Sequence, residues 1–427
     1  MMDAIVKKDS LNNSIDSTVG FARGQIIKSS IEEGQRLRHG QFIAAERVNK
    51  SGADSIGIFT GNQRDFLVKE SDLSTYCEEW VGPGLIANQV KKLAIEHMGG
   101  DISKHEVAIF NRTSAAIISV IASIADNKSI ISVVPTNGRS HASVIRGAKL
   151  ANVDVIEVQS SNDWQEIILK NKPNLVIITT VTSSLERMPD DIIQQIADFA
   201  KQSQASVFLD EAYGARLRPV LHNGLKSLQF NSVDAVVTNC DKAGLPGPRA
   251  GILVADKNII ASAAAKGAEY GMEARAPILA GVMRSLEAYD STHLLQEVDS
   301  GRLLASALFK QYGEIVHTSD LGPMIHEDDV LKLMIDRAKL DVTNVKVVPC
   351  EATAALGMIL LKDYGILTVN THGQPGARVS LRFKPSGNAI QNVGGIENIM
   401  IAIDSSINKV ANQLIDLQSM KRLILGD

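Results

Sequence analysis

The chain has 427 residues, of which 44% are hydrophobic and 22% charged, and its formal net charge is −4. This length suffices for one large domain and one smaller domain. The slightly acidic balance, with no long basic block, argues against nucleic acid or an anionic membrane as the main partner. The cysteines stand in no CxxC or Cys/His spacing, so neither a disulfide framework nor a metal site is expected. Since the sequence shows no signal-peptide pattern and no membrane-spanning apolar stretch, a cytoplasmic protein is expected.

Residues 1–56 are expected to form an N-terminal arm. Residues 1–20 are polar and rich in Ser, Asn and Asp, which is typical of a frayed or disordered segment. From Ile26 to about Val48, apolar residues recur at helical spacing among charged ones and predict one or two helices. The arm is too short and too acidic to be a nucleic-acid-binding domain.

Residues 57–290 alternate short apolar strands with helices. This alternation predicts an α/β domain with a mostly parallel central sheet that is covered on both faces. The expected strands are 107–110, 130–134, 153–158, 175–179, 207–209, 233–237 and 251–254. The expected helices between them include 85–98, 117–124 and 190–202, the last of which follows Pro189.

Residues 291–427 are expected to form a smaller α+β domain. The chain is helix-permissive from Ile259 to Leu308, and a long helix is expected to begin at Pro277. The expected later elements are strands at 323–327, 345–348, 358–362, 367–370 and 379–383, and a final helix from 396 to about 423.

The strongest functional signal lies between Val207 and Gly251. The first strand of this stretch ends in Asp210, and the second is followed by Lys242. Because ligands of open α/β sheets bind outside the carboxyl ends of the strands, both groups are expected to face one cleft. An acid and an amine there suit pyridoxal phosphate (PLP), whose aldehyde needs a lysine and whose pyridinium nitrogen needs an anion. The sequence therefore predicts a PLP site with Lys242 as the Schiff-base lysine.

Each of these residues also has an ordinary structural explanation. A lysine in a turn after a strand is usually a solvated surface group, and Asp210 could cap the following helix. Ala212 is small enough to pack under a cofactor ring, and an ordinary core alanine is equally consistent with its position.

Arg112, Thr113 and Ser114 lie at a strand-to-helix junction and are the candidate phosphate site. Free N–H groups, two hydroxyls and the helix dipole favour an anion at such a junction, although plain helix capping is the alternative. Asn239, before Lys242, and Arg249, after it, would close the same site from the other side.

Two further residues are candidates for the substrate side of the site. His141 would place an imidazole against the exposed face of the cofactor and take part in proton transfer, although a lone histidine is more often structural. Arg378 begins a late predicted strand and would bind a substrate carboxylate through a bidentate contact. Arg382 would point to the same face by strand alternation, so the choice between the two stays open, and a surface arginine is the alternative.

These motifs resemble a known family. Asp210-Glu211-Ala212 and Asp241-Lys242, followed by Gly-Pro-Arg-Ala-Gly at 247–251, resemble the fold-type I PLP enzymes of the aspartate aminotransferase superfamily. Within it, the Asp-Lys and Gly-Pro-Xaa-Ala-Gly pattern is similar to that of bacterial L-seryl-tRNA(Sec) selenium transferases. Asn111-Arg112-Thr113-Ser114 is similar to the corresponding motif of their archaeal PLP-protein relatives. The resemblance covers residues 57–290, and the C-terminal domain more loosely.

The resemblance implies a Schiff-base lysine at Lys242, a pyridine-nitrogen aspartate at Asp210, and active sites shared within a homodimer or a larger ring. It favours β-elimination or β-replacement on an amino acid or amino-acid-like substrate over transamination. Selenium transferases have a larger N-terminal region, and they have Gln where this chain has Arg249, so tRNA is not an expected partner. A selenium-transferase-like enzyme acting on aminoacyl-tRNA and a non-catalytic interaction protein are the alternatives.

Overall fold

The structure, a computed structural model, describes residues 7–63, 65–377 and 379–426. The chain divides into two units, which we name the terminal unit (Met1–Gly61 with Leu295–Asp427) and the sheet unit (Asn62–Leu294). The N-terminal arm, which the sequence suggests as a separate part, thus groups with the C-terminal residues.

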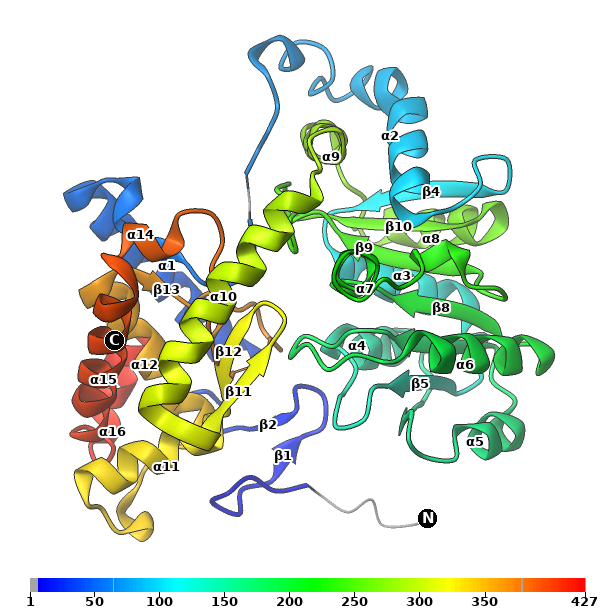
Figure 1. Cartoon of the computed structure of the whole chain (residues 1–427). Helices are drawn as coiled ribbons and strands as arrows, with labels where there is room; N and C mark the ends of the chain where they lie inside the picture. The colour runs from blue at the N-terminus through cyan, green and yellow to red at the C-terminus, as the bar shows by residue number, and fades with distance from the viewer. Residues whose placement is uncertain (1–6, 64, 378, 427) are drawn as a thin grey trace. The chain divides into compact units, whose positions relative to one another are not determined.

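The sheet unit is built on a sheet of seven described strands in the order β4-β10-β9-β8-β7-β5-β6 (Figure 1). The strands are β4 (His105–Phe110), β5 (Ile130–Val134), β6 (Val155–Gln159), β7 (Leu175–Thr179), β8 (Ser206–Asp210), β9 (Ala235–Asn239) and β10 (Gly251–Asp256). Only β10 among them runs antiparallel to its neighbours, and the other pairs are parallel. The predicted mostly parallel sheet is therefore confirmed.

Because β10 is antiparallel to both β4 and β9, those two strands run in the same direction. The carboxyl ends of β4 to β9 and the first residue of β10 therefore lie along one edge of the sheet, which we name the carboxyl edge.

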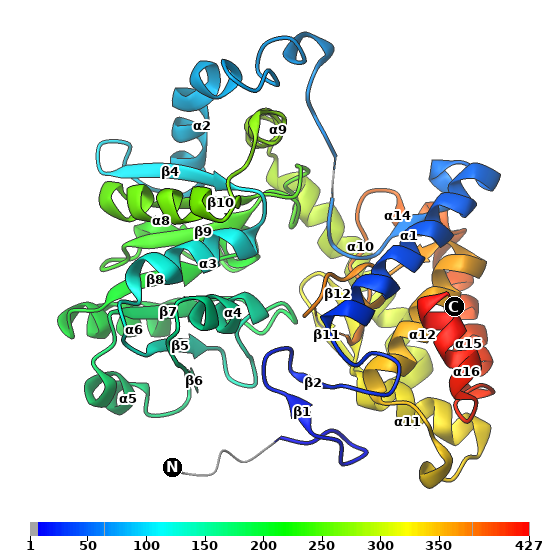
Figure 2. The same cartoon turned by 180° about the vertical axis from the view of Figure 1, so that it is seen from behind.

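Helices cover both faces of this sheet. They are α2 (Gly82–Met98), α3 (Thr113–Ile124), α4 (Ala142–Leu150), α5 (Trp164–Asn171), α6 (Asp190–Gln202), α7 (Gly214–Leu221), α8 (Lys257–Glu269) and α9 (Ala276–Glu287). The helices α3, α4 and α8 lie on one face (Figure 2), where their residues pack with Ile177 and Phe208. On the other face, Val176 and Leu209 pack with residues of α2, α6 and α9. Burial on both faces explains why the strands are almost continuously apolar in sequence.

The terminal unit contains shorter strands and longer helices. Its strands are β1 (Ile15–Asp16), β2 (Phe21–Ala22), β3 (Gly57–Ile58), β11 (Val316–Ser319), β12 (Gly322–Ile325), β13 (Ile366–Leu367) and β14 (Leu381–Arg382). Its helices are α1 (Ser30–Ser51), α11 (Glu327–Ala338), α12 (Pro349–Tyr364), α13 (Val369–His372), α14 (Ala389–Asn392), α15 (Gly395–Ala411) and α16 (Leu417–Leu425). The helix α10 (Ser291–Tyr312) joins the two units along the chain. Short 3₁₀ helices are η1 (Ala53–Ser55), η2 (Glu70–Asp72), η3 (Ser227–Gln229), η4 (Gly313–Ile315) and η5 (Val342–Asn344).

Several predicted elements of the C-terminal part are wrong. Residues 358–362 lie inside α12, and residues 345–348 connect η5 to that helix, so neither segment is a strand. The core-facing helix α12 is apolar around most of its circumference, and such a run cannot be told from a buried strand by periodicity. The expected single helix from 396 is two helices, because α15 ends at Ala411 and α16 begins after Asp416. The Asp416 side chain accepts the backbone N–H groups of Gln418 and Ser419.

The N-terminal segment also differs from the prediction. The sequence predicts a frayed or disordered segment over residues 1–20, of which residues 1–6 lie outside the described residues. Within the described part, Ile15–Asp16 pairs in antiparallel register with Phe21–Ala22. Both Phe21 and Ala22 are buried, so packing holds a segment whose composition alone favours disorder.

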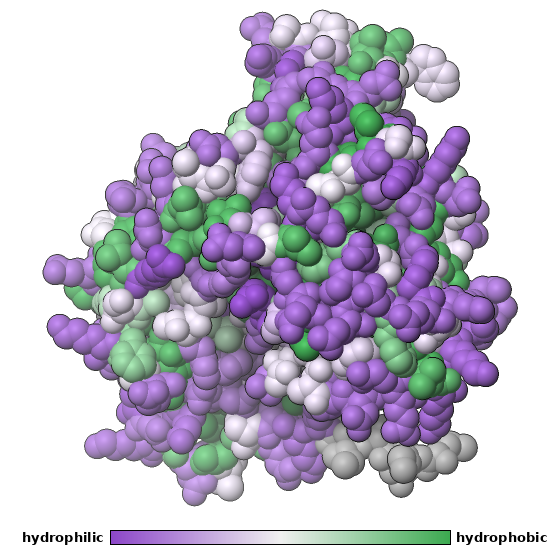
Figure 3. Space-filling model, turned by 45° about the vertical axis from the view of Figure 1, so that its right-hand side comes forward, coloured by the Kyte–Doolittle hydropathy of each residue, from purple (hydrophilic) through white to green (hydrophobic). Residues whose placement is uncertain are grey.

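On the face that Figure 3 shows, the surface is largely hydrophilic, and its hydrophobic residues lie in small groups. Within the described ranges, none of the helices combines the length and the apolar character that crossing a membrane requires.

Candidate active site

The chemistry-bearing residues of the sheet unit gather at the carboxyl edge, because the strands that lead to them are parallel. Arg112 follows β4, His141 lies beyond β5, Asp210 ends β8 and Lys242 follows β9. Strands β8 and β9, which lead to Asp210 and Lys242, are neighbours in the sheet, about 4.8 Å apart. Arg112 follows a strand further out, and its charge, after burial and the charge of Lys242, lowers the pKa of His141, so the turns bring these residues near one another. The electrostatic interactions agree, since the charge of Lys242 acts on both His141 and Asp210.

Asp210 is a buried carboxyl group, only 4% exposed. The backbone N–H of Ala212 hydrogen-bonds the carboxyl group, yet burial raises its pKa to about 6. Its Oδ1 atom is buried and has no hydrogen-bond partner among the described residues. A buried oxygen without a partner costs free energy, and a pyridinium N–H is a group that would satisfy it. The helix α7 begins only after Tyr213 and takes no side-chain cap, so capping does not explain this aspartate.

Lys242 lies in the turn after β9, and its backbone is held from two sides. Arg216 Nε donates to the Lys242 carbonyl oxygen at 3.1 Å, and Asn62 forms an isolated antiparallel bridge with Lys242. The side-chain amine lies 5.0 Å from the centroid of the Tyr213 ring, which is itself 4% exposed. This amine therefore packs over an aromatic face, unlike an ordinary solvated surface lysine.

Tyr213 is a residue of this site that sequence reasoning missed. It stands three positions after Asp210 in the same turn, so the turn that places the carboxyl group also places the ring under the amine. Tyr213 could have been found from the sequence, because it is an aromatic residue in the turn that follows the candidate aspartate.

His141 is the N-cap of α4. Its Nδ1 accepts the backbone N–H of Ser143 at 3.2 Å and lies 2.6 Å from the Ser143 hydroxyl oxygen. Burial, followed by the positive charges of Lys242 and Arg112, lowers the pKa of the imidazole to about 3. The ring is therefore neutral at physiological pH, and Nδ1 as an acceptor leaves the proton on Nε2. His141 can therefore cap α4 through Nδ1 and donate a hydrogen bond through Nε2 at the same time.

The N-terminus of α3 matches the predicted phosphate site in position. Its N-cap residue, Arg112, makes no side-chain capping bond, and Thr113 and Ser114 in the first turn are half-buried. A Cβ atom added to Gly251 would lie 2.6 Å from the Arg112 carbonyl oxygen and 2.8 Å from the Thr113 Cα. Gly251 is therefore packed against this helix end, and Arg249 precedes it by two residues in the chain. A helix N-terminus with arginines beside it favours an anion.

Gly251→Ala is expected to weaken both folding and cofactor binding, because its new methyl group would press on backbone atoms that cannot rotate away. Overpacking of this kind costs about 1–3 kcal/mol, and a displaced α3 would raise the Kd for PLP. Urea unfolding and PLP titration measure the two effects. Gly84→Ala in α2 is the matched control, since nothing lies within 4 Å of its added Cβ, and it should leave PLP affinity unchanged. Wild-type affinity in Gly251→Ala would contradict the placement of the phosphate.

Asn239 and Ala212 are joined to each other by contacts within the protein. The Ala212 carbonyl oxygen accepts from Asn239 Nδ2 and, at 3.2 Å, from Arg216. The Asn239 Oδ1 atom accepts from Arg216 at 2.7 Å. The Asn239 amide thus links the turns that follow β8 and β9, and its contact with a phosphate stays a prediction.

Two buried arginines of α7 were also missed. Arg216 is 1% exposed, and the side chain of Arg218 is fully buried. Arg218 pairs with Glu211 and, at 3.2 Å, with Asp190. Their sequence signal is a pair of arginines two apart, directly behind the candidate aspartate.

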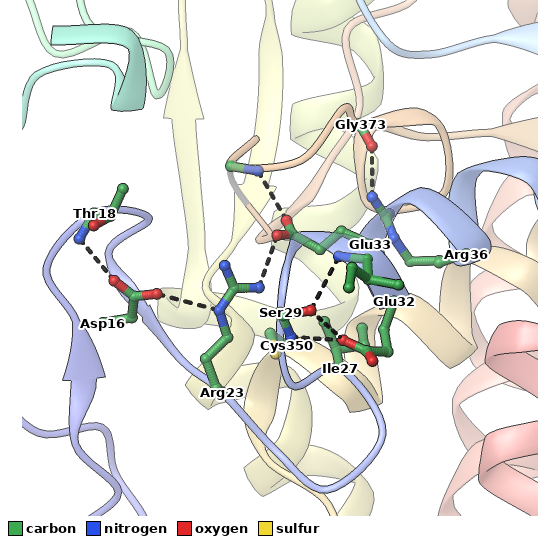
Figure 4. Close-up of polar contacts among 12 residues, drawn as sticks. Asp16, Thr18, Arg23, Ile27, Ser29, Glu32, Glu33, Arg36, Cys350 and Gly373 are labelled. Carbon is green, nitrogen blue, oxygen red and sulfur yellow. Dashed lines mark hydrogen bonds and ion pairs between the residues drawn. The ribbon is translucent and has the colours of Figure 1, made fainter. Parts of the chain in front are cut away.

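Arg378, the predicted carboxylate-binding residue, lies outside the described residues. The segment before it is tied to α1, where Glu33 accepts the N–H of Gly376 at 2.8 Å and Arg36 donates to the Gly373 carbonyl at 2.5 Å. Figure 4 shows Glu33 held in turn by Arg23, at 2.7 Å. The other candidate, Arg382, is in β14 and is 3% exposed, so the choice between the two arginines stays open.

Comparisons with known proteins show the family to which the chain belongs. A family model for aminotransferases of class I and II matches residues 81–323. The chain is 28% identical over 407 residues to a "UPF0425 pyridoxal phosphate-dependent protein" of Methanothermobacter thermautotrophicus, which covers 94% of this chain and 100% of the relative. A protein of the same description from Methanococcus maripaludis is 29% identical over 355 residues, covering 83% of this chain and 92% of the relative.

Two solved structures share the fold. The SepCysS component in a complex of SepCysS with the N-terminal domain of SepCysE matches with a TM-score of 0.56 and 14% identity, over 86% of this chain and 98% of that one. The histidinol-phosphate aminotransferase of Clostridium acetobutylicum matches with a TM-score of 0.55 and 15% identity, over 84% of this chain and 100% of that one. The chain therefore belongs to the class I and II aminotransferase family and is a PLP-dependent enzyme.

Proposed function

We propose that this enzyme uses Lys242 as its Schiff-base lysine and carries out β-elimination or β-replacement on an amino acid or amino-acid-like substrate. The observation that carries the proposal is the pairing of a buried carboxyl group, Asp210, with an amine at the same edge of the sheet. The preference for β-chemistry over transamination rests on the resemblance of residues 241–251 to the selenium transferases.

PLP, when bound, supplies an aldehyde for an amine and a ring that withdraws electrons from the substrate Cα. Asp210 would accept the pyridinium N–H through its Oδ1 atom and so hold the ring in its charged form. The N-terminus of α3 would hold the phosphate with Arg112 and Arg249 beside it, and with the Thr113 and Ser114 hydroxyls in its first turn.

Lys242 Nζ would remove the proton from the substrate Cα and return a proton to the group that leaves from Cβ. The Tyr213 ring, 5.0 Å from this nitrogen, restricts where the amine can go. His141 would lie against the open face of the cofactor and donate from Nε2, and Ala212 would leave room on the other face. Arg378 or Arg382 would bind the substrate carboxylate.

The wider setting forms part of the same proposal. The protein would work in the cytoplasm as a homodimer or larger homo-oligomer that shares its active sites between subunits. These expectations come from the family resemblance and from the sequence composition.

Borohydride reduction of the PLP-loaded protein, followed by peptide mapping, tests the lysine assignment. We expect loss of the yellow absorbance and a pyridoxyl phosphate group on the peptide that contains Lys242. Lys201 is the internal control, because its half-exposed amine pairs with Asp234 in the same unit. Equal labelling of Lys201 and Lys242, or no label on Lys242, would overturn the assignment.

A substrate screen then separates the reaction types. The screen would use serine and cysteine with their phosphorylated and D-forms. β-Elimination releases ammonia and a 2-oxo acid while the cofactor is unchanged, whereas transamination leaves the cofactor in its amine form. Salt-sensitive binding of tRNA would instead favour the aminoacyl-tRNA alternative.

A further inference from the structure

We infer that Arg216 is a positioning residue, which sets the place of Lys242 relative to Asp210 and so controls the proton transfer that Lys242 performs. This inference rests on the proposed role of Lys242. Arg216 lies in the first turn of α7, directly behind the Asp210 turn, and is 1% exposed. It is not one of the residues predicted to bind the cofactor.

The guanidinium group of Arg216 has five N–H donors, and the structure supplies an acceptor for each of them. Those acceptors are the Lys242 carbonyl at 3.1 Å, Thr238 Oγ1 at 3.0 Å, His97 Nε2 at 3.4 Å, the Ala212 carbonyl at 3.2 Å and Asn239 Oδ1 at 2.7 Å. A guanidinium group whose five N–H donors each bind a separate acceptor is held in one orientation.

Two of these acceptors, the Ala212 and Lys242 carbonyl oxygens, lie in the turns after β8 and β9, and the others lie in β9 and α2. The last backbone hydrogen bond between these segments runs from the Glu211 N–H to the Val237 carbonyl, at 2.9 Å. Beyond that point, Ala212 belongs to the turn after β8, and Lys242 belongs to the turn after β9. Arg216 contacts both turns, and it also holds Asn239, whose amide donates to the Ala212 carbonyl oxygen. The distance between the Asp210 carboxyl group and the Lys242 amine therefore depends on the guanidinium group of Arg216.

His97 is suited to its place in this arrangement. Burial, followed by the charges of Arg216 and Lys226, lowers the pKa of its imidazole to about 3. The neutral ring can then accept from Arg216 through Nε2 while its edge packs on Tyr289, with 4.8 Å between the ring centroids. A protonated His97 would offer a donor where Arg216 needs an acceptor.

Arg218, two residues along the same helix, shows the contrast. Its guanidinium contacts the carboxylates of Glu211 and Asp190 and the Leu225 carbonyl, at 2.9 Å for the last of these. Those contacts join α7 to the residues around Asp190 and Leu225, and none of them is with the turn that carries Lys242. Of these two arginines, Arg216 is the one that contacts Lys242, at its backbone carbonyl oxygen.

Arg216→Lys tests the inference, because a lysine keeps the charge but donates from one point and cannot span both turns. We expect kcat to fall about 100-fold with little change in KM, since displacing a reacting group by about 1 Å costs that much. The pH at which the absorbance of the bound cofactor changes should shift as well. Borohydride should still label Lys242, which shows that the cofactor and its lysine are in place.

Arg284→Lys is the matched control for loss of a guanidinium group that donates to several acceptors. Arg284 is half-buried and donates to both Asp72 carboxylate oxygens, at 2.7 and 2.9 Å, and to Glu287, which are residues outside the two turns. This variant should lose stability in urea but keep the wild-type absorbance titration. Thr238→Val removes one acceptor of Arg216 and should give a smaller change in kcat and in the titration, in the same direction as Arg216→Lys.

Wild-type kcat and titration in both Arg216→Lys and Thr238→Val would overturn the inference, as would a change no different from that of Arg284→Lys. If Arg216→Lys does not fold, Thr238→Val alone decides, by the presence or absence of the shift. The proposed function fails separately, by the absence of a borohydride label on Lys242 in the wild-type protein.

Discussion

Lys242→Ala is expected to lower the rate at which the substrate Cα hydrogen exchanges with solvent by about 10⁴-fold, the upper range for loss of a positioned base. The other titratable groups of the site are poor replacements. The imidazole of His141, with a pKa of about 3, is a weak base, and the carboxyl group of Asp210 is buried for a different task. Deuterium incorporation into the substrate, followed by NMR, measures the rate.

A small amine added to Lys242→Ala should restore part of the exchange, because the deleted side chain leaves space beside the Tyr213 ring. Lys201→Ala should exchange at the wild-type rate, since its amine pairs with Asp234 on the protein surface. Exchange by Lys242→Ala within about tenfold of the wild-type rate would refute the role of Lys242 as the base.

Asp210→Asn is expected to make the cofactor-free protein more stable at pH 8 while lowering its affinity for PLP about 100-fold. The reason lies in the pKa of this carboxyl group, which burial raises from 3.8 to about 6 in the folded protein. Below pH 3.8 the group is protonated in the folded and unfolded chains alike. As the pH rises from there to about 6, the unfolded chain ionises first, so the free energy of unfolding falls.

Above about pH 6 the free energy of unfolding has fallen by its full amount, about 3 kcal/mol. An asparagine at position 210 does not ionise, so Asp210→Asn avoids this loss of stability. With PLP bound, the wild-type protein would instead be the more stable of the two, because the pyridinium N–H pairs with the ionised Asp210 carboxylate and cannot pair with an amide in the same way. Urea unfolding of the cofactor-free protein at several pH values, together with PLP titration, measures both effects.

Asp72→Asn is the control of opposite sign. Its hydrogen bonds with Arg284 are the main reason that the pKa of the Asp72 carboxyl group is lowered to about 2. Asp72 therefore stabilises the fold above pH 3.8, and that contribution is lost as the pH falls toward 2. Asp72→Asn should destabilise the protein at pH 8. If Asp210→Asn does the same without cofactor, the burial cost assigned to Asp210 is wrong.

The sequence by itself determined the class of the sheet unit and predicted that Asp210 and Lys242 form its functional pair. Strands buried on both faces are apolar throughout, so 130–134 and 175–179 could be recognised from composition and length. The bounds of α6 (Asp190–Gln202) agree with the prediction because Pro189 marks its start. Asp210 and Lys242 could be paired because the carboxyl ends of parallel strands meet at one edge.

Only the tertiary structure decided the contacts that join segments far apart in the chain. Arg216 is an ordinary helix residue in sequence, and its role depends on acceptors contributed by residues from His97 to Lys242. Likewise, Met358 to Leu361 is a helix because that segment is surrounded by the core of its unit, which a short apolar run does not reveal. Local patterns encode periodicity and burial, whereas the partner of a buried polar group is set by packing between elements.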